Sequence, residues 1–507
     1  MAEVTRKSVM AVKKETTVGT PVMPTSGADF VALQDDVSMK PSFDKIDNNE
    51  LSSSVGVKPQ ILGIEQPEFS FSHYMRHSGV EATDPSFMEF MEGAFGLKVA
   101  ATTERDTVSG STAGTSSAAA VIKVNTGEGA EYQKGKALLI KDGTNGYSIR
   151  NVQSVSSDDL TLGFNLANAP GTGVNLGRAI LLKPDDAPPS LTVALYTGNK
   201  GALQVMAGGR VSQLELKAEA GQPLNGSFTV AGTSYYFDPI EIGATDIMLD
   251  FLDDATTRVA TIAAKLYKDP HELAAAIQTA MNSLGSSNAF TCTYSDSTGK
   301  FTITSNGTTL TLKWNTGANA SNTVGDKIGF STAADSSAAL TYTSATAQSW
   351  ASPYTPTPDS NIDPVIVKAH EVMIGDFDDY GCSGVQSFDV TLSNDLQDVK
   401  DVCEDSGIKE KILSKRTIEA KVVINLVAND ADKFRRFRSG SDVRFAYNGG
   451  VKSGGNWVAG RCFNLYLPEA KITEYEVTDT DGIVTIEATI QAYVKTDGQG
   501  EAFFNFL

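Results

Sequence analysis

The chain has 507 residues, of which 41% are hydrophobic and 20% charged, so its length allows several domains and its composition is that of folded protein. Its formal net charge of −19 argues against tight binding to DNA or RNA, because nucleic-acid binders neutralise phosphates with clustered lysine and arginine. No apolar run approaches the ~18 residues that cross a bilayer, so we expect no membrane insertion.

The N-terminal part predicts an arm followed by a small β unit. Residues 1–25 combine lysines with glycine, proline and threonine, which is typical of an extended arm. Over residues 30–95 we expect short strands, a turn at Gly56 and a short helix. Asp84 is the predicted N-cap of this helix and Pro85 its first residue.

Composition changes sharply after residue 99. Residues 100–119 are rich in threonine, serine, glycine and alanine, which is typical of a linker. Apolar and polar residues then alternate between turn signals at 142–143 and 145–146, up to prolines at 184–189. We therefore predict that residues 100–186 are a small β module inserted into the first β unit.

A second module of a different kind is predicted over residues 236–350. Asp269, Pro270 and Glu272 have the spacing of a helix start with a capping box, and apolar residues follow at helical spacing. Short strands are expected afterwards, with Trp314 and Phe330 in the core. This pattern predicts a helix packed on a small sheet.

The chain contains a weak internal repeat. Residues 56–71 and 407–422 share five identities at a constant offset of 351, including Gly56 with Gly407 and Lys58 with Lys409. Each copy is followed by a short capped helix and later by two alternating strands. These strand pairs are predicted at 211–216 with 226–230 and at 472–477 with 484–490.

We interpret this order of elements as one β unit used twice. The first unit comprises residues 1–99 and 187–235, and the second comprises residues 351–507. The predicted fold class is therefore mostly β, with two tandem β-sandwich units, short helices and the two inserted modules.

No arrangement of residues predicts catalysis, a cofactor or a metal site. His73 and His77 lie four positions apart on a predicted strand, roughly 13 Å, which is too far for one metal, and we expect them to be half-exposed. Residues 479–482 resemble the opening of a calcium loop, but flanking strands favour a hairpin turn. With four histidines and no convergent constellation, an enzyme is not expected.

The cysteines indicate a reducing compartment. Cys292, Cys382, Cys403 and Cys462 are spread along the chain without the CxxC spacing of zinc sites. We interpret them as reduced and mostly buried, which agrees with assembly in a cytoplasm.

Two segments carry a resemblance to a known family. The block from Ala11-Val12-Lys13-Lys14 to Phe95-Gly96 resembles tail tube proteins of long-tailed bacteriophages, and so does the segment from Gly208-Gly209-Arg210-Val211 to Val230. The resemblance implies β-sandwich subunits whose inner sheets join edge to edge into rings. Stacked rings form the tube through which DNA leaves the capsid.

The resemblance also implies partners and a place in the virion. With two fused units, three copies would complete a pseudo-hexameric ring in a non-contractile tail, assembled in the host cytoplasm. Other tail proteins, namely the tape measure, tail terminator and distal tail proteins, would be partners. DNA would pass an acidic lumen without specific binding. We predict ring-stacking contacts at Lys13, Lys14, Gly56, Lys58, Gly407 and Lys409, although the glycines are equally consistent with simple hairpin turns.

One alternative from another class remains open. The inserted modules would suit a β-rich virion decoration protein or a host-surface protein that binds carbohydrate. Exposed aromatic clusters in the modules would favour it, yet Trp314, Tyr294 and Phe330 fall within strand patterns as expected core residues.

Overall fold

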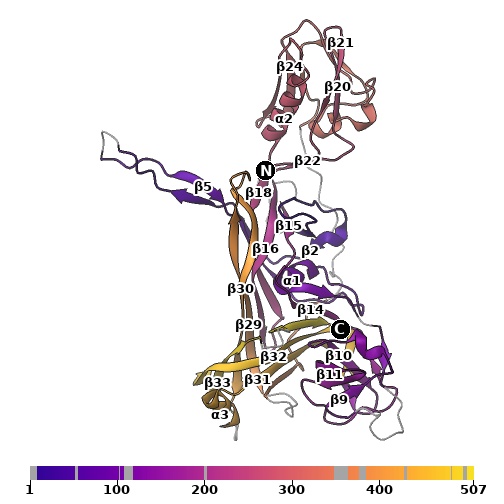
Figure 1. Ribbon diagram of the computed structural model, residues 1–507, viewed down its shortest axis with the longest axis vertical. Coiled ribbons are helices and arrows are strands. Elements are labelled where there is room, and N and C mark those ends of the chain that lie inside the picture. Colours follow the sequence, from indigo (N-terminus) through magenta and orange to yellow (C-terminus); the bar gives the residue numbers. More distant parts are fainter. Residues whose placement is uncertain are drawn as a thin grey trace. The chain divides into compact units, whose positions relative to one another are not determined.

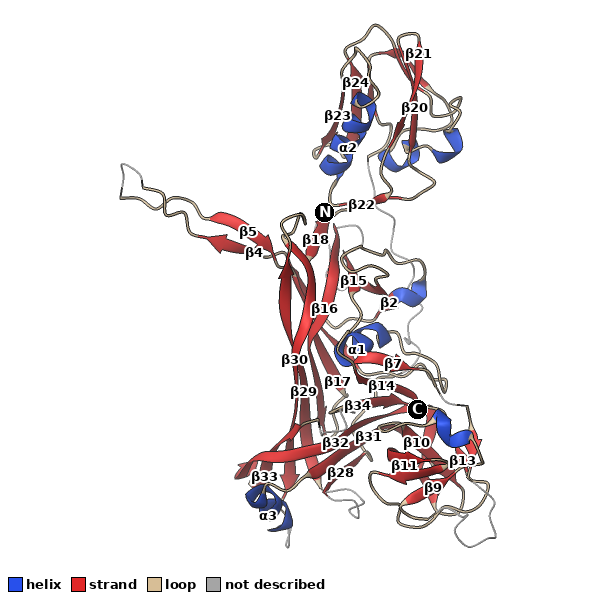
Figure 2. Cartoon of the chain, viewed as in Figure 1, coloured by secondary structure: helices blue, strands red, loops and turns tan. Residues whose placement is uncertain are grey.

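The structure is a computed structural model that describes residues 8–51, 55–101, 103–107, 118–198, 202–347, 363–375, 384–426, 431–480, 482–494 and 500–507. These residues are mostly in strands, with α1, α2 and α3 as their α-helices, so the mostly-β prediction is confirmed (Figure 2). The chain divides into two compact units. We call Met10–Val193, Ala207–Ser234 and Thr355–Leu507 the larger unit, and Met1–Val9, Ala194–Met206 and Tyr235–Tyr354 the smaller unit.

The smaller unit contains the predicted helix-and-sheet module. Its helix α2 (Pro270–Asn282) starts as expected: the Asp269 side chain accepts from the Glu272 backbone N–H at 2.8 Å, and Glu272 accepts from the Lys268 N–H. Trp314 and Phe330 are buried in its core. Its strands form several small sheets around this core: β19 (Ile240–Ile242), β20 (Met248–Asp253), β21 (Thr256–Thr261), β22 (Lys265–Tyr267), β23 (Phe290–Ser295), β24 (Lys300–Ser305), β25 (Leu310–Leu312), β26 (Ser336–Ala339) and β27 (Thr341–Thr343). The preceding strand, β18 (Ser234–Phe237), belongs to the large sheet instead.

The larger unit is built on long antiparallel strands (Figure 1). Its first half contains β2 (Phe30–Val31), β3 (Ser38–Lys40), β4 (Phe43–Ile46), β5 (Ile61–Glu65), β6 (Glu68–Tyr74), α1 (Met88–Phe95), β7 (Gly96–Val99), β14 (Ile180–Pro184) and β17 (Asn225–Ala231). It also contains most of β1 (Val9–Lys14), the first residues of β15 (Leu191–Thr197) and residues 207–219 of β16 (Ala202–Glu219). Its second half contains β28 (Glu371–Gly375), β29 (Val385–Lys400), β30 (Ile408–Asn425), α3 (Ala431–Ser439), β31 (Val443–Ser453), β32 (Asn456–Thr480), β33 (Ile483–Ala492) and β34 (Phe503–Phe506).

Three local predictions about the N-terminal part are wrong. Residues 9–14 form β1, which pairs with β2 and buries Met10, so residues 1–25 are not an extended arm throughout. Helix α1 begins at Met88, with Phe87 at the N-cap, because residues 85–88 first make a turn and Asp84 instead pairs with Lys98. His73 and His77 are buried, not half-exposed.

The small β module is a separate six-stranded sheet within the larger unit. Its strands are β8 (Arg105–Asp106), β9 (Val121–Lys123), β10 (Ala137–Asp142), β11 (Gly146–Ser156), β12 (Asp159–Leu162) and β13 (Asn175–Leu176). The predicted turn at 142–146 joins β10 to β11. β14 pairs with β7 and β34 instead, so residues 180–184 belong to the surrounding sheet. The division of the chain into four parts remains a prediction.

Two groups of four strands in the larger unit have the same pairing. In the first group the neighbours are β3–β6, β6–β17 and β17–β16; in the second they are β29–β30, β30–β33 and β33–β32. The registers agree as well. Ser70 lies opposite Thr229, and Lys421, which is 351 positions after Ser70, lies opposite Thr489.

The same irregularity occurs in both groups. β16 has a bulge between Val211 and Gln213, and β32 has one between Ile472 and Glu474. At each bulge the extra residue is a hydroxyl donor: Ser212 Oγ donates to the Thr229 carbonyl at 3.1 Å, and Thr473 Oγ1 donates to the Thr489 carbonyl at 3.3 Å. Matching registers and a matching bulge make β3, β6, β17 and β16 the counterparts of β29, β30, β33 and β32.

The two groups join edge to edge inside the chain. Residues 213–219 of β16 pair antiparallel with residues 387–393 of β29, with Leu216 opposite Val390. We call this pairing the internal seam. It makes one continuous sheet of eight strands in the order β3, β6, β17, β16, β29, β30, β33 and β32.

Candidate assembly surfaces

The eight-stranded sheet has one apolar and one polar face, because side chains alternate along each strand. Residues opposite one another in an antiparallel pair share a face, so the registers assign each side chain. Phe71, Leu216, Val390 and Ile490 are buried on the apolar face. On that face Phe71 packs on Phe90 of α1, with ring centroids 4.7 Å apart.

The other face, which we call the polar face, carries more acidic than basic side chains. The registers place ten carboxylates on it: Glu68, Glu215, Glu219, Asp389, Asp395, Glu410, Glu419, Glu474, Glu476 and Glu487. They place six basic side chains there: Lys40, Arg210, Lys217, Lys415, Lys421 and Lys471. The remaining positions are mostly serine, threonine, asparagine and glutamine, such as Ser70, Thr229 and Ser393.

Neighbouring charged side chains on the polar face shift one another's pKa values. Lys217 Nζ lies 3.1 Å from Glu215 Oε1, and this hydrogen bond raises the pKa of Lys217. Partial burial raises the pKa of the Asp389 carboxyl, and the nearby Glu215 and Glu219 raise it further, against Lys217 and Lys421. The face therefore carries a net negative charge that is only partly balanced locally.

A hairpin formed by β4 and β5 projects from the larger unit (Figure 1). Apolar side chains are exposed along its described residues: Phe43, Ile46, Leu51, Val55, Val57, Ile61 and Leu62. A two-stranded hairpin is marginally stable alone, and a row of exposed apolar residues marks an interaction surface. The hairpin therefore has the character of a segment that binds another surface.

The six predicted stacking residues fall in three places. Gly56 and Lys58 lie in the β4–β5 hairpin, where Lys58 Nζ bonds Glu50 Oε2 at 2.5 Å. Gly407 and Lys409 lie where the β29–β30 hairpin turns into β30, and Gly407 has a φ of +76°, which suits glycine. Lys13 and Lys14 lie in β1, within 2.9 Å of Asp29 and 2.6 Å of Glu92.

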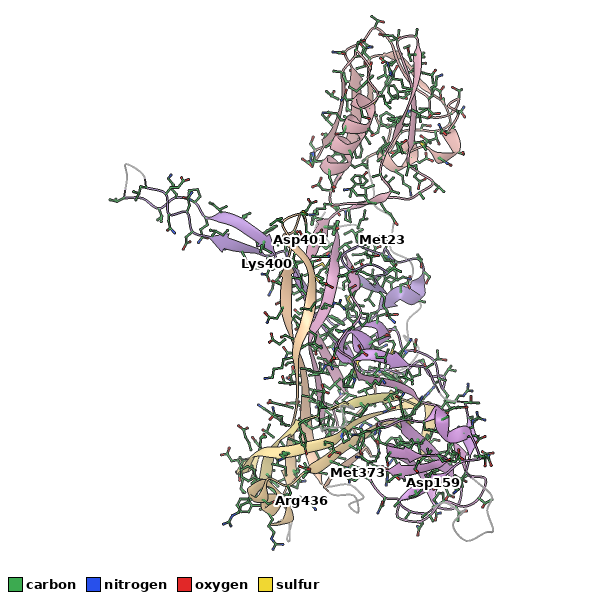
Figure 3. The ribbon with its side chains drawn as sticks, in the orientation of Figure 1. Met23, Asp159, Met373, Lys400, Asp401 and Arg436 are labelled. Atoms are coloured by element: carbon green, nitrogen blue, oxygen red, sulfur yellow. The ribbon has the colours of Figure 1, made fainter. Side chains whose placement is uncertain are left out.

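The structure brings two of these places together. The Glu65 backbone N–H at the base of the β4–β5 hairpin donates to the Ser406 carbonyl at 3.3 Å, and a Cβ on Gly407 would lie 3.2 Å from Ile64. Figure 3 labels Lys400 and Asp401 at this end of the β29–β30 hairpin. The repeat-related segments thus meet, whereas Lys13 and Lys14 are held by ion pairs within the chain.

Sequence reasoning did not find the internal seam or the continuous polar face. Each strand alternates, but the alternation does not show which distant strand lies beside it. The constant offset of 351 was the available signal, because two groups with the same strand order have complementary end strands that can pair and extend one sheet.

The buried histidines define a pH response of the larger unit. Burial lowers the pKa of His77 to about 3, and Arg461 and His370 lower it further. Burial also lowers the pKa of His370 to about 4, and this ring hydrogen-bonds the Tyr447 hydroxyl at 2.6 Å. Both rings are therefore neutral in the folded chain at neutral pH.

We expect the chain to lose stability as the pH falls below about 6.5. Unfolded histidines then bind protons that the folded rings do not, so the free energy of unfolding falls by about 1.4 kcal/mol per pH unit for each ring until its folded pKa is reached. Urea unfolding at pH 7.5 and 5.0 measures this loss. His77→Phe should reduce it by about 2 kcal/mol, and His271→Gln, which removes a histidine from α2 of the smaller unit, is the matched control. An unchanged pH dependence in His77→Phe contradicts the assignment.

Within the described ranges, no group of three or more histidine, cysteine or acidic side chains is arranged to hold a metal ion. No α-helix in the same part of the chain is long and apolar enough to span a membrane. Cys292 and Cys462 are buried free thiols and Cys403 is exposed, while Cys382 lies outside the described residues.

Comparison with known families identifies the class. The family model of phage tail tube proteins matches residues 5–257, about half of the chain, including β3, β6, β16 and β17. The chain belongs to the phage tail tube proteins, which are structural components of the virion tail that assemble into a tube. No curated protein sequence matches the chain. Strands β29, β30, β32 and β33 lie beyond the matched residues.

Proposed function

We propose that this chain is a two-unit tail tube protein of a long-tailed phage with a non-contractile tail. The observation that carries this proposal is the four-strand pairing that occurs twice in the chain. Strands β3 and β6 correspond to β29 and β30 at an offset of 351 residues, and β16 and β32 have a bulge at the corresponding position. Two units per chain make three copies sufficient for a pseudo-hexameric ring. Stacked rings then form the tube.

The polar face is the candidate lining of the tube. Its ten carboxylates outnumber its six basic side chains, which gives a net negative surface, and DNA is a polyanion. At ~0.15 M salt the repulsion extends only about 8 Å from the wall. Such a lining keeps DNA from adhering during genome ejection into the host cell but does not drive its movement.

The β4–β5 hairpin is the candidate contact between stacked rings. Its exposed apolar side chains include Leu51, Val55 and Val57, and burial of such residues stabilises association. Gly56 and Lys58 lie in this hairpin, Gly407 lies against Ile64 at its base, and Lys409 follows in β30. Lys13 and Lys14, at the end of β1, also remain predicted stacking residues.

The experiment is imaging of the purified full-length protein by electron microscopy, with the copies per ring counted from averaged end views. We expect tubes or rings of constant diameter with three copies each. Six copies per ring would contradict the two-unit arrangement. A stable monomer at high concentration that binds glycans would instead support the decoration or host-surface alternative.

The same proposal includes contacts with the tape measure, tail terminator and distal tail proteins, and assembly in the host cytoplasm.

A further inference from the structure

The internal seam shows how two of these four-strand groups join. Residues 213–219 and 387–393 pair antiparallel along seven positions, and Leu216 and Val390 at its centre are 4% and 3% exposed. On the polar face of the seam, Glu215 lies opposite Thr391 and Lys217 lies opposite Asp389. The seam thus combines a buried apolar row with a polar row on the other side.

The outer ends of the eight-stranded sheet have the same two edges as the seam. The counterpart of β16 is β32, whose residues 474–480 pair with β33 on one side. The counterpart of β29 is β3, which pairs with β6. Within the described residues, no strand pairing covers the second side of residues 474–480 or of β3. Val477, the counterpart of Leu216, is 55% exposed instead of 4%.

We propose that residues 474–480 of one copy pair antiparallel with residues 36–42 of a second copy, in the register of the internal seam. This inference rests on the proposed function and specifies the contact between neighbouring chains. The offsets that relate the groups place Val477 opposite Met39, Glu476 opposite Lys40 and Thr478 opposite Ser38.

The chemistry of the two edges fits this register. Val477 and Met39 occupy the apolar row, where Leu216 and Val390 are buried in the seam. Glu476 and Lys40 are both exposed and occupy the polar row, where opposite charges attract. The negative charge of Glu476 and the positive charge of Lys40 would therefore lie next to each other at the centre of the contact.

Pro41 supports the assignment of this strand as an edge. Proline donates no backbone hydrogen bond and is found in sheets mainly on edge strands, where it limits unregulated pairing. In the proposed register Pro41 lies opposite Tyr475, towards the end of the contact. The central pairs from residue 476 to residue 479 therefore contribute most of the backbone hydrogen bonds.

Cysteine pairs test the register in the full-length chain, with Cys403 and Cys382 changed to serine. Directly opposite residues in antiparallel strands have Cα atoms 4.5–5.5 Å apart, which suits a disulfide, whereas three positions of offset add roughly 10 Å. We expect Met39→Cys with Val477→Cys to cross-link neighbouring copies under mild oxidation, at least tenfold more than Met39→Cys with Glu474→Cys. Non-reducing gels of assembled material measure both.

Charge exchange gives a second readout that does not depend on oxidation. Lys40→Glu alone should reduce assembly, measured by sedimentation, and adding Glu476→Lys should restore it. Rings or tubes that form without the Met39–Val477 cross-link and without this rescue would overturn the register while the proposed function stands. Absence of rings and tubes in the unmodified protein would overturn both.

Discussion

Replacing Val55 and Val57 by aspartate is expected to leave the chain folded and its rings intact but to prevent tube growth. Both valines are fully exposed in the β4–β5 hairpin, so the folded chain loses no packing. If the hairpin inserts into the next ring, each lost valine contact removes about 1.5–3 kcal/mol, and burying a carboxylate without a partner adds to this. Association between rings should fall by at least about 100-fold per chain.

Tube length in electron micrographs and the sedimentation profile measure this effect, with circular dichroism as the check of folding. Val259→Asp is the matched control, because Val259 is an exposed valine on β21 of the smaller unit. It introduces the same charge without touching the hairpin and should leave tube length unchanged. Tubes of ordinary length from the Val55→Asp, Val57→Asp protein would exclude the hairpin as the stacking contact.

The repeat was predictable because it depends on local patterns. Alternation predicts each strand and its buried face, and shared glycine and lysine positions fix an offset of 351 that the strand registers reproduce at Ser70 and Lys421. The α2 cap was equally local, since Asp269, Pro270 and Glu272 are adjacent in sequence. Features encoded within about ten residues were therefore accessible from the sequence.

The errors concern contacts between distant residues. β1 was predicted as part of an arm because it contains lysines and is followed by glycine and prolines, but Met10 is buried in β1, which pairs with β2 and β15. His77 was expected to be half-exposed, yet it stacks on Phe463 with ring centroids 5.0 Å apart. Neither burial has a signal within the local sequence, because the covering residues come from other strands.

The last feature that the sequence did not predict is a buried amide cluster, which we define as Asn151, Asn448, Asn464 and Asn505. Asn464 is its centre: its amide donates to Asn151 and Asn448 at 2.9 and 2.8 Å and accepts from Asn151 and Asn505 at 2.6 and 3.1 Å. Asn448, Asn464 and Asn505 are fully buried. The cluster joins β11 of the small β module to β31, β32 and β34.

Asn464→Ala is expected to destabilise the larger unit by about 3–5 kcal/mol. The substitution removes hydrogen bonds from three buried amides at once, and each buried polar group left without a partner costs about 1–3 kcal/mol. The urea midpoint of the larger unit measures the loss, and Asn168→Ala is the control because Asn168 is exposed in the same module. A loss no greater than that of the control would show that water or rearranged amides replace the Asn464 side chain. The expected loss would instead show that this cluster attaches the small β module to the rest of the larger unit, since its partners outside the module come from three strands, β31, β32 and β34.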